Sequence, residues 1–484
     1  MESLWSKTSI PQNFPSLRGD LSVEAAVIGG GLAGILTAYF LSRRNVRAIV
    51  IEADKIGSGQ TKNTTAKITS QHNLIYNRLI QTFGEEKAKQ YAEANQQAIR
   101  QYRNLTAEYS IDCLFEERPA YLYSAAQRDV LALEQETEAA TSLGIQAEFT
   151  AQTFLPFPVA GAVKFKGQAQ FHPLRFLQAV SKDLTVFEHT RVRNVEENRI
   201  LTDRGTVTAK HIVFASHFPF LNMPGFYFAR MHQERSYVLA LENAADLDGM
   251  YLGAGPEGIS FRDFRGTLLL GGQSHRTGEN SSGGKYDLLR KKAAEFYPGS
   301  KETAHWSAQD CITLDGVPYI GQFAPSAPNW YVATGFGKWG MTSSMVSALL
   351  ISDQITGVEN PCAPVFSPLR FTPSASVKAF LVDMGQAVKG ISRQTFSIPK
   401  TDLDVLPAGH GGVVENEGEK VGIYKDEQEK IYAVSTRCPH LGCQLEWNPD
   451  EKSWDCPCHG SRFDYKGNLL DNPAQKNLEN SGHE

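Results

Sequence analysis

The sequence predicts an α/β protein with a Rossmann-like nucleotide-binding unit near its start and a small all-β domain at its end. Three observations predict this fold class. A strand, a glycine turn, a helix and a second strand follow one another in residues 24–54. A second strand, glycine turn and helix occupy residues 329–357. From about Ser397 onward, short strand-like runs are separated by turns, as in a small antiparallel domain.

Length and composition narrow the class of function. A chain of 484 residues is too long for one ordinary core, so we expect two or three domains. A net charge of −5 without a long basic run argues against a nucleic-acid partner. No stretch approaches the ~18 uninterrupted apolar residues of a membrane span. The opening MESLWSKTSIPQNFPSLRGD lacks the features of a signal peptide, so we expect a cytoplasmic enzyme.

The first glycine turn has the context of a dinucleotide site. Gly29, Gly31 and Gly34 form G-x-G-x-x-G between the apolar strand 25–28 and a helix. Glu52 ends the next strand, 18 residues past Gly34, where a ribose hydroxyl would need an acceptor. The glycines would let the backbone approach a pyrophosphate at the helix N-terminus. A glycine-rich turn with nothing bound is the alternative, but every element of the dinucleotide fingerprint is present.

Two further glycine patterns match the same spacing, but only the second lies between a strand and a helix. In GAGPEG (253–258) a proline stands where the helix should start, so we expect a loop. GFGKWG (335–340) follows a strand at 330–334 and precedes a helix that begins near Met341, but no acidic residue follows for a ribose. A second dinucleotide is therefore not predicted. The helix N-terminus can instead stabilise negative charge on the pyrimidine edge of a flavin.

Four stretches together resemble the D-amino-acid oxidase/glycine oxidase superfamily of FAD enzymes, over roughly residues 22–357. They are GGGLAG with Glu52, GSGQTKNTTAK (57–67), RVRNVEENRILTDRGTVTAKHIVFASH (191–217) and TLDGVPYIG with NWYVATGFGKWGMT (313–342). The resemblance implies an FAD-binding domain of separate segments with an α+β substrate domain inserted. The predicted segments are 1–80, 151–217 and 308–357 for FAD binding, and 81–150 and 218–307 for the substrate domain.

The same resemblance implies how FAD is held and used. It places Val192 near the adenine and Ala215 near the ADP portion. Thr64, Thr65 and Lys67 would lie along the pyrophosphate and the isoalloxazine. The turn residues Gly335, Gly337, Lys338 and Gly340 would lie by the pyrimidine carbonyl. Members of the superfamily oxidise the C–N bond of an amine or amino acid by hydride transfer to flavin N5, often without a side-chain base.

Two departures bear on the substrate. Several relatives place an arginine before the DGxPxIG segment to bind a substrate carboxylate, but here Gln309 and Asp310 occupy that stretch. Asp310 suits a cation, so we hypothesise an amine or polyamine-like substrate. Asp310 as a turn or surface residue is the alternative. Arg262 and Arg265 could bind a carboxylate instead, and the amine preference would then fail.

The second departure is Lys338, where many relatives have a small residue or a histidine. Its ammonium could stabilise the reduced flavin, or it could be a solvated lysine. His217, Tyr237 and His275 are further pocket candidates, although a lone residue of these types is more often structural.

The last tenth of the chain holds four of its seven cysteines, in CPHLGC and CPCHG. Cys438-x-His440 and Cys456-x-x-His459 are separated by 15 residues and offer two sulfurs and two imidazoles. Zinc is one possible occupant. Zinc fingers usually group like ligands, whereas here each loop carries one of each kind, which suits a two-iron cluster with cysteines on one iron and histidines on the other. Cys113, Cys311 and Cys362 are expected to be buried small hydrophobes.

These loops closely resemble a Rieske [2Fe–2S] domain over about residues 398–484, preceded by a proline-rich linker or strap at 358–397. The resemblance makes Cys438, His440, Cys456 and His459 the cluster ligands and Cys443 with Cys458 a disulfide. GNLLDNPAQKNL (467–478) would be the loop that shields the cluster. Ser461 matches a serine that donates to a bridging sulfide. Phe463 replaces a tyrosine, so the predicted potential lies below the top of the ~−150 to +300 mV Rieske span.

The sequence therefore predicts an FAD-dependent amine or amino-acid dehydrogenase whose Rieske cluster relays electrons singly to an external protein or quinone. An oxidase that reacts directly with dioxygen would need no such cluster. One rival is an NAD(P)H-fed flavin/Rieske reductase for a partner oxygenase, and another is a non-catalytic redox sensor. A Rieske oxygenase is disfavoured, because no grouping of two histidines and a carboxylate is evident outside the cluster.

Overall fold

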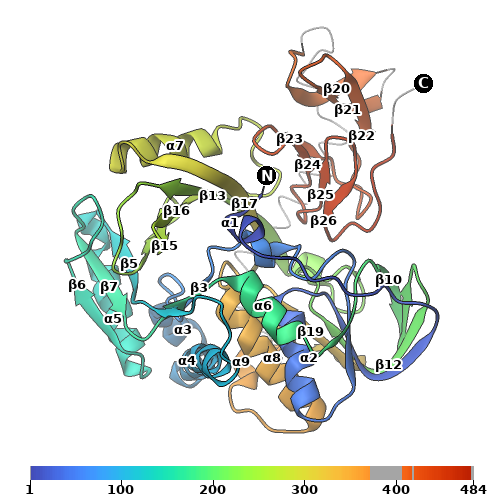
Figure 1. Cartoon of the computed structure of the whole chain (residues 1–484), viewed down its shortest axis with the longest axis horizontal. Coiled ribbons are helices and arrows are strands. Elements are labelled where there is room, and N and C mark those ends of the chain that lie inside the picture. Colours follow the sequence, from blue (N-terminus) through green and yellow to red (C-terminus); the bar gives the residue numbers. More distant parts are fainter. Residues whose placement is uncertain (1, 371–405, 417–418, 481–484) are drawn as a thin grey trace.

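Two eight-stranded sheets form the body of the protein, and a small C-terminal domain lies against one side of it (Figure 1). The computed structural model describes residues 2–370, 406–416 and 419–480. The predicted linker from 371 to 397 lies outside the described residues. The predicted fold class is confirmed.

The first sheet carries the predicted βαβ unit. Strands β1 and β2 are parallel, and β12 and β19 continue the parallel order on the other side of β1. Helices α2 and α8 pack against each other on this sheet. The bounds are β1 (Leu21–Ile28), α2 (Leu32–Arg43), β2 (Ala48–Ile51), α6 (Pro173–Ser181), β9 (Thr185–Phe187), β10 (Val192–Glu196), β11 (Arg199–Thr202), β12 (Thr206–Phe214), β18 (Tyr319–Ala324), β19 (Ala327–Thr334) and α8 (Gly340–Thr356).

The second sheet has the order β17-β13-β16-β15-β14-β5-β7-β6. Helix α5 packs on β6 and β7, and α7 packs on β13 and β16. The long strands β13 and β17 form the edge that faces the C-terminal domain (Figure 1). The bounds are β5 (Ala120–Ser124), α5 (Val130–Ser142), β6 (Ala147–Thr150), β7 (Gly161–Phe165), β13 (Met231–Glu242), β14 (Met250–Gly253), β15 (Ser260–Phe264), β16 (Thr267–Arg276), α7 (Lys285–Phe296) and β17 (Lys301–Thr313).

Two consecutive helices lie further along the chain. They are α3 (Tyr76–Phe83) and α4 (Glu85–Glu108), separated at Gly84, whose φ of +85° favours glycine. Helix α4 packs on α8, and the hydroxyl of Tyr102 donates to the carbonyl of Met341 at 2.8 Å.

Three features of the structure cross the predicted domain boundaries, which stay predictions. Residues 85–108 pack on α8 of the nucleotide-binding side, although 81–150 was assigned to the substrate domain. Strand β7 belongs to the second sheet because it pairs with β5, although 151–217 was assigned to FAD binding. The boundary at 308 falls inside β17, which stays paired with β13 up to Thr313.

The C-terminal domain consists of two small antiparallel sheets, as predicted. The four-stranded sheet lies nearer the body in Figure 1, and the three-stranded sheet projects away from it. Trp447, Trp454 and Phe463 are buried in its core. The bounds are β20 (Gly411–Asn416), β21 (Glu419–Lys425), β22 (Ile431–Ser435), β23 (Glu446–Asn448), β24 (Ser453–Asp455), β25 (Arg462–Asp464) and β26 (Leu469–Asp471).

Short elements complete the described chain. They are α1 (Leu4–Lys7), the 3-10 turns η1 (Gln60–Asn63), η2 (Gln127–Asp129) and η3 (Tyr227–Ala229), the small sheet β3 (Lys67–Ile68), β8 (Ala169–Gln170) and β4 (Glu116–Glu117), and α9 (Ala363–Phe366). After α9, the buried Arg370 forms an ion pair of 2.8 Å with Asp315. The described part of the predicted strap is thereby attached to the body.

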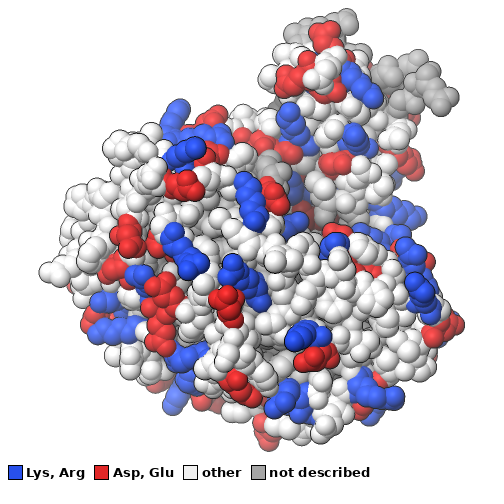
Figure 2. Space-filling view, in the orientation of Figure 1, with Lys and Arg blue, Asp and Glu red and all other residues white. Residues whose placement is uncertain are grey.

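Surface charge agrees with the composition. On the face shown in Figure 2, acidic and basic residues are interspersed rather than gathered by sign. Within the described ranges, every helix is too short or too polar to cross a membrane.

Candidate active site and cluster site

A cavity of about 1060 Å³ lies where the ends of β1, β2 and β12 meet the second sheet. Its wall includes the first glycine turn, the loop after β2, the loop between β14 and β15, and the start of α8. Residues 469–472 of the C-terminal domain also line it. This volume is at the upper end of the range typical of small-molecule sites, as a dinucleotide requires.

The first glycine turn is built for close backbone approach. Gly29 has φ +113°, and a Cβ there would lie 2.5 Å from the carbonyl oxygen of Ala215. A Cβ on Gly34 would lie 1.9 Å from the carbonyl oxygen of Gly29, so Gly34 serves the packing of helix on strand rather than the cavity wall. Gly31 faces the cavity. The close backbone approach expected of this turn agrees with the geometry.

Glu52 lies at the end of β2 and lines the cavity. Its carboxylate accepts hydrogen bonds from the backbone N–H of Gly30 at 2.6 Å and of Asp54 at 2.9 Å. Burial raises its pKa, and these two donors oppose that effect. The two bonds fix the orientation of the carboxylate and leave lone pairs for ribose hydroxyls.

Large buried side chains position the loop after β2. The indole N–H of Trp5 donates to the carbonyl of Thr64 at 2.6 Å. Trp306 donates to the carbonyl of Asn63 at 2.9 Å. The loop therefore presents Thr64 and Thr65 to the cavity from a fixed backbone.

Lys67 also lines the cavity. Its ammonium donates to the carbonyl of Tyr251 at 2.9 Å and to the hydroxyl of Ser260 at 2.6 Å. Burial, assisted by the charge of Arg262, lowers its pKa to about 7. A lysine with that pKa is partly neutral at physiological pH and can exchange a proton with a bound group.

Most of the predicted FAD residues line the cavity, namely Gly29, Gly31, Glu52, Thr64, Thr65, Lys67, Val192, Ala215, Lys338 and Gly340. Gly335 and Gly337 lie behind its wall. A Cβ on Gly335 would lie 2.3 Å from Cγ2 of Thr313, and the N–H of Gly337 donates to the carbonyl of Cys311 at 3.0 Å. Both glycines have positive φ and shape the turn before α8.

Asp310 and Lys338 face the cavity together. Burial raises the pKa of Asp310 to about 6, against the opposing charge of Lys338. The ammonium of Lys338 lies 2.9 Å from the carboxylate of Glu234 and 2.9 Å from the hydroxyl of Ser274. Lys338 therefore has its own counter-ion, and Asp310 is not a turn or surface residue but part of the cavity wall.

The remaining candidates separate into two groups. His217 and Tyr237 line the cavity. The hydroxyl of Tyr237 lies 3.0 Å from Nε2 of His275, which is not among the lining residues. Tyr237 and His275 thus bond to each other beside the C-terminal domain.

The two candidate carboxylate-binding arginines lie outside the cavity wall. Arg262 is fully buried and donates to the carbonyl of Thr65, to Oε1 of Gln170 at 3.0 Å and to the carbonyl of Phe171 at 2.9 Å. All three of its nitrogens are thereby bonded to the protein itself, one of them to the loop after β2. Arg265 is exposed at the β15–β16 turn. The alternative in which these arginines bind a substrate carboxylate is wrong.

Sequence reasoning missed two parts of the wall. The loop 253–258, set aside as a chance glycine match, does form a loop, but Gly255 and Pro256 line the cavity. Residues 469–472 come from the predicted cluster-shielding loop. No spacing signal links either segment to the first glycine turn, because the contact depends on how the domains pack.

The four predicted cluster ligands converge at the tips of two loops. The rings of His440 and His459 lie 4.8 Å apart and perpendicular. A hydrogen bond from the buried Cys456 thiol lowers the pKa of Cys438. Nδ1 of His440 is buried without a hydrogen-bond partner among the described residues, while its Nε2 lies 2.7 Å from Oδ1 of Asn222. A histidine with one anchored and one unused nitrogen fits a metal ligand.

Cys443 and Cys458 form the predicted disulfide between the two loops. The sulfurs of Cys443, Cys456 and Cys458 lie within 4.8 Å of one another, but two of them are consumed by the disulfide. That leaves the alternating set of two cysteines and two histidines, which fits a Rieske cluster. The hydroxyl of Ser461 accepts from the N–H of Ala474 at 2.9 Å and also interacts with the Cys438 thiol. The predicted burial of Cys113, Cys311 and Cys362 is confirmed.

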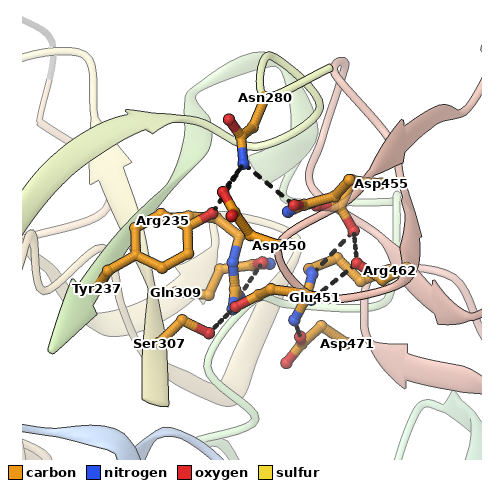
Figure 3. A network of polar contacts seen from close by, with 12 residues as sticks. Arg235, Tyr237, Asn280, Ser307, Gln309, Asp450, Glu451, Asp455, Arg462 and Asp471 are labelled. Atoms are coloured by element: carbon orange, nitrogen blue, oxygen red, sulfur yellow. Dashed lines mark hydrogen bonds and ion pairs between the residues drawn. The ribbon is translucent and has the colours of Figure 1, made fainter. Parts of the chain in front are cut away.

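Buried polar contacts hold the C-terminal domain against β13, β17 and the loop before α7 (Figure 3). Arg235 pairs with Glu451 at 2.6 Å, and Arg462 also contacts Glu451. Asp450 accepts from the N–H groups of Gly284 and Lys285 at 3.0 Å, so it caps α7 from the other domain. Asn280 donates to Asp450 at 2.8 Å. This interface places the cluster loops beside the cavity.

Comparison with known proteins agrees with both parts of this site. The family model "FAD dependent oxidoreductase" matches residues 24–354, and the model "Rieske [2Fe-2S] domain" matches residues 398–481. A relative in Bacillus subtilis (strain 168), YhfW, whose name describes a Rieske 2Fe-2S iron-sulfur protein, is 36% identical over 99% of this chain and 97% of its own.

Solved structures show the same fold. The crystal structure of glycine oxidase from Geobacillus kaustophilus has a TM-score of 0.62 and 19% identity, covering 72% of this chain and 99% of that one. The crystal structure of L-proline dehydrogenase from P. horikoshii has a TM-score of 0.60 and 16% identity, and the match covers 73% of this chain and 98% of that one. The matched families imply FAD and a [2Fe–2S] cluster, and the glycine turn, the cavity and the alternating ligand set described above are the residues that would hold them. The chain belongs to the FAD-dependent oxidoreductase family that includes D-amino-acid oxidase, and it carries a C-terminal Rieske domain.

Proposed function

We propose that this enzyme is a dehydrogenase that oxidises the C–N bond of an amine or amino acid and passes the electrons singly through its cluster. The observation that carries the proposal is the shared cavity wall. Residues 469–472 of the Rieske domain and Gly29 of the FAD site line one cavity. An oxidase that delivers electrons directly to dioxygen has no use for a cluster domain in that position. The name of one structural neighbour, a proline dehydrogenase, is in line with this choice.

The reaction divides between the cofactors and the chain. Bound FAD supplies hydride acceptance at N5, and the cluster supplies single-electron transfer. The substrate loses a hydride and a proton to become an imine, which water hydrolyses. The two electrons end on an external one-electron acceptor, a protein or a quinone. The chain's own residues orient the substrate in the cavity.

The charges of the cavity favour a cationic substrate over a carboxylate. Among the described lining residues the only arginine is Arg191, beside Val192 at the predicted adenine end. Lys338 is neutralised by Glu234. Asp310 has a pKa of about 6, so it is mainly ionised at neutral pH and can bind an ammonium group. An amine is therefore our preferred substrate class, and a cytoplasmic location remains a prediction.

Anaerobic mixing of the holoenzyme with amines, amino acids and NADH tests the proposal. Flavin absorbance and the EPR signal of the reduced cluster are followed together. We expect an amine to bleach the flavin and the cluster signal to rise afterwards. Reduction by NADH alone would establish the reductase rival. An assembled flavin that none of these compounds reduces would favour the redox sensor.

A further inference from the structure

The two histidine ligands face different surroundings. His459 is 6% exposed, whereas His440 is only partly buried. The carbonyl of His459 accepts a hydrogen bond of 2.7 Å from Nε2 of Gln233 on β13. Both ligands contact the flavoprotein body, because the ring of His440 bonds to Asn222. His459 is the more buried of the two, and its backbone carbonyl is bonded to strand β13 through Gln233.

Gln233 is held in place by a second buried glutamine. Nε2 of Gln309 on β17 donates to Oε1 of Gln233 at 2.6 Å and to the carbonyl of Gly460 at 2.8 Å. The two glutamines are 1% and 0% exposed. A Cβ on Gly460 would lie 2.6 Å from Cβ of Gln233, so glycine is required for this approach. The cluster loop and the strand pair thus meet without intervening solvent.

The same glutamine touches the cavity wall. Oε1 of Gln233 lies 3.8 Å from Sγ of Cys311, its cross-strand neighbour on β17. Cys311 lines the cavity, and its carbonyl accepts from the N–H of Gly337 in the turn before α8. The chain of contacts from ligand to cavity is therefore His459, Gln233 and Cys311. Nothing in the catalytic chemistry of the cavity uses this cysteine.

We propose that Gln233 and Cys311 form the electron path from the flavin cavity to His459, an inference that rests on the proposed flavin-to-cluster relay. Electronic coupling falls less steeply through bonds and hydrogen bonds than across empty space. In each transfer the reduced flavin loses one electron and the oxidised cluster gains one. The second electron follows once the cluster has delivered the first electron to the external one-electron acceptor.

Light-driven reduction of the holoenzyme's flavin isolates this step from the substrate. A deazaflavin photoreductant donates electrons to the flavin, and the cluster's absorbance then reports the arrival of each electron. We expect Gln233→Met to slow that first-order step about tenfold or more. Cys311→Ala removes the sulfur without touching the cluster loops, and we expect it to slow the same step. The matched control is Asp450→Asn, which weakens the same domain interface away from the path.

Two readouts distinguish a role of these residues in electron transfer from a purely structural role in holding the domains together. Hydrogen exchange of the peptide 456–463 should rise in Gln233→Met and stay unchanged in Cys311→Ala, because Gln233 bonds to that loop and the side chain of Cys311 does not. The EPR spectrum of the chemically reduced cluster shows whether each variant has assembled its cluster. If Gln233→Met loses the cluster, the transfer rate in Cys311→Ala decides whether the proposed electron path is used. Unchanged transfer in Cys311→Ala, or equal slowing in Asp450→Asn, overturns the proposal. Failure of every amine to reduce the flavin would instead overturn the proposed function and leave this experiment interpretable.

Discussion

Glu451 is the acidic centre of the interface between the two domains (Figure 3). It contacts Arg235 on the flavoprotein side and Arg462 on the Rieske side, and its side chain is only 4% exposed. Replacement by glutamine keeps the shape and removes the charge. Arg235 then keeps only neutral partners, Ser307 and Gln309, in a buried site.

The structure gives the size of the expected loss in the free energy of unfolding. Burial by itself would raise the pKa of Glu451, but the charges of Arg235 and Arg462 outweigh it and lower the pKa from 4.5 to about 2. At about 1.36 kcal/mol for each unit of pKa, this change corresponds to roughly 3 kcal/mol. Removal of one partner from a buried ion pair generally costs about 3–5 kcal/mol, which agrees. We expect Glu451→Gln to lower the free energy of unfolding by about 3 kcal/mol at neutral pH.

Urea unfolding followed separately by cluster circular dichroism and flavin fluorescence measures the loss, since a chain of several domains need not unfold in one step. The matched control is Glu295→Gln, whose 2.9 Å pair with Lys292 is 57% exposed on the glutamate side. We expect this control to lower the free energy of unfolding by only about 0–1 kcal/mol. Because the folded pKa of Glu451 is depressed, its contribution is complete above pH 4.5 and fades as the pH falls toward 2. Equal losses in the two variants, or a loss that persists at low pH, would refute the reasoning.

Three further predictions concern the cofactors and the substrate. Glu52→Ala should weaken FAD binding about tenfold or more, because the ribose acceptor is lost. Titration of the apoprotein, followed by flavin fluorescence, measures this, and Glu24→Ala, outside the cavity wall, is the control. For a cationic amine, kcat/KM should rise as the pH increases through about 6, where Asp310 ionises, and Asp310→Asn should abolish that rise; an unchanged profile would contradict the role of Asp310. Ser461→Ala should lower the cluster's midpoint potential in a redox titration, because a hydrogen bond to the sulfur shell is lost; an equal potential would mean that its hydroxyl serves only Ala474.

The local patterns were the predictable part of this protein. The βαβ unit follows from glycines and an acid at fixed spacing, and the cluster site follows from alternating cysteines and histidines. The role of Arg262 could not be read from the sequence SFRDF, because a charged residue in such a strand can face either a substrate or a buried carbonyl. The predicted boundary at 308 falls inside β17, which continues through it paired with β13.

Contacts between distant segments could not be predicted from one sequence. Arg235 and Glu451 are separated by 216 residues, and neither is part of a local motif. The same holds for Gln233 and His459, 226 residues apart. Such pairs depend on the docking of one domain on the other, which is set by shape, by glycines that permit close approach and by the balance of buried charge.

The wall contributed by residues 469–472 has a consequence for the life of the holoenzyme. The wall of this cavity is complete only while the cluster domain is docked. Displacement of that domain would expose the cavity on one side, so we expect the retention of bound flavin to depend in part on how firmly the two domains stay together.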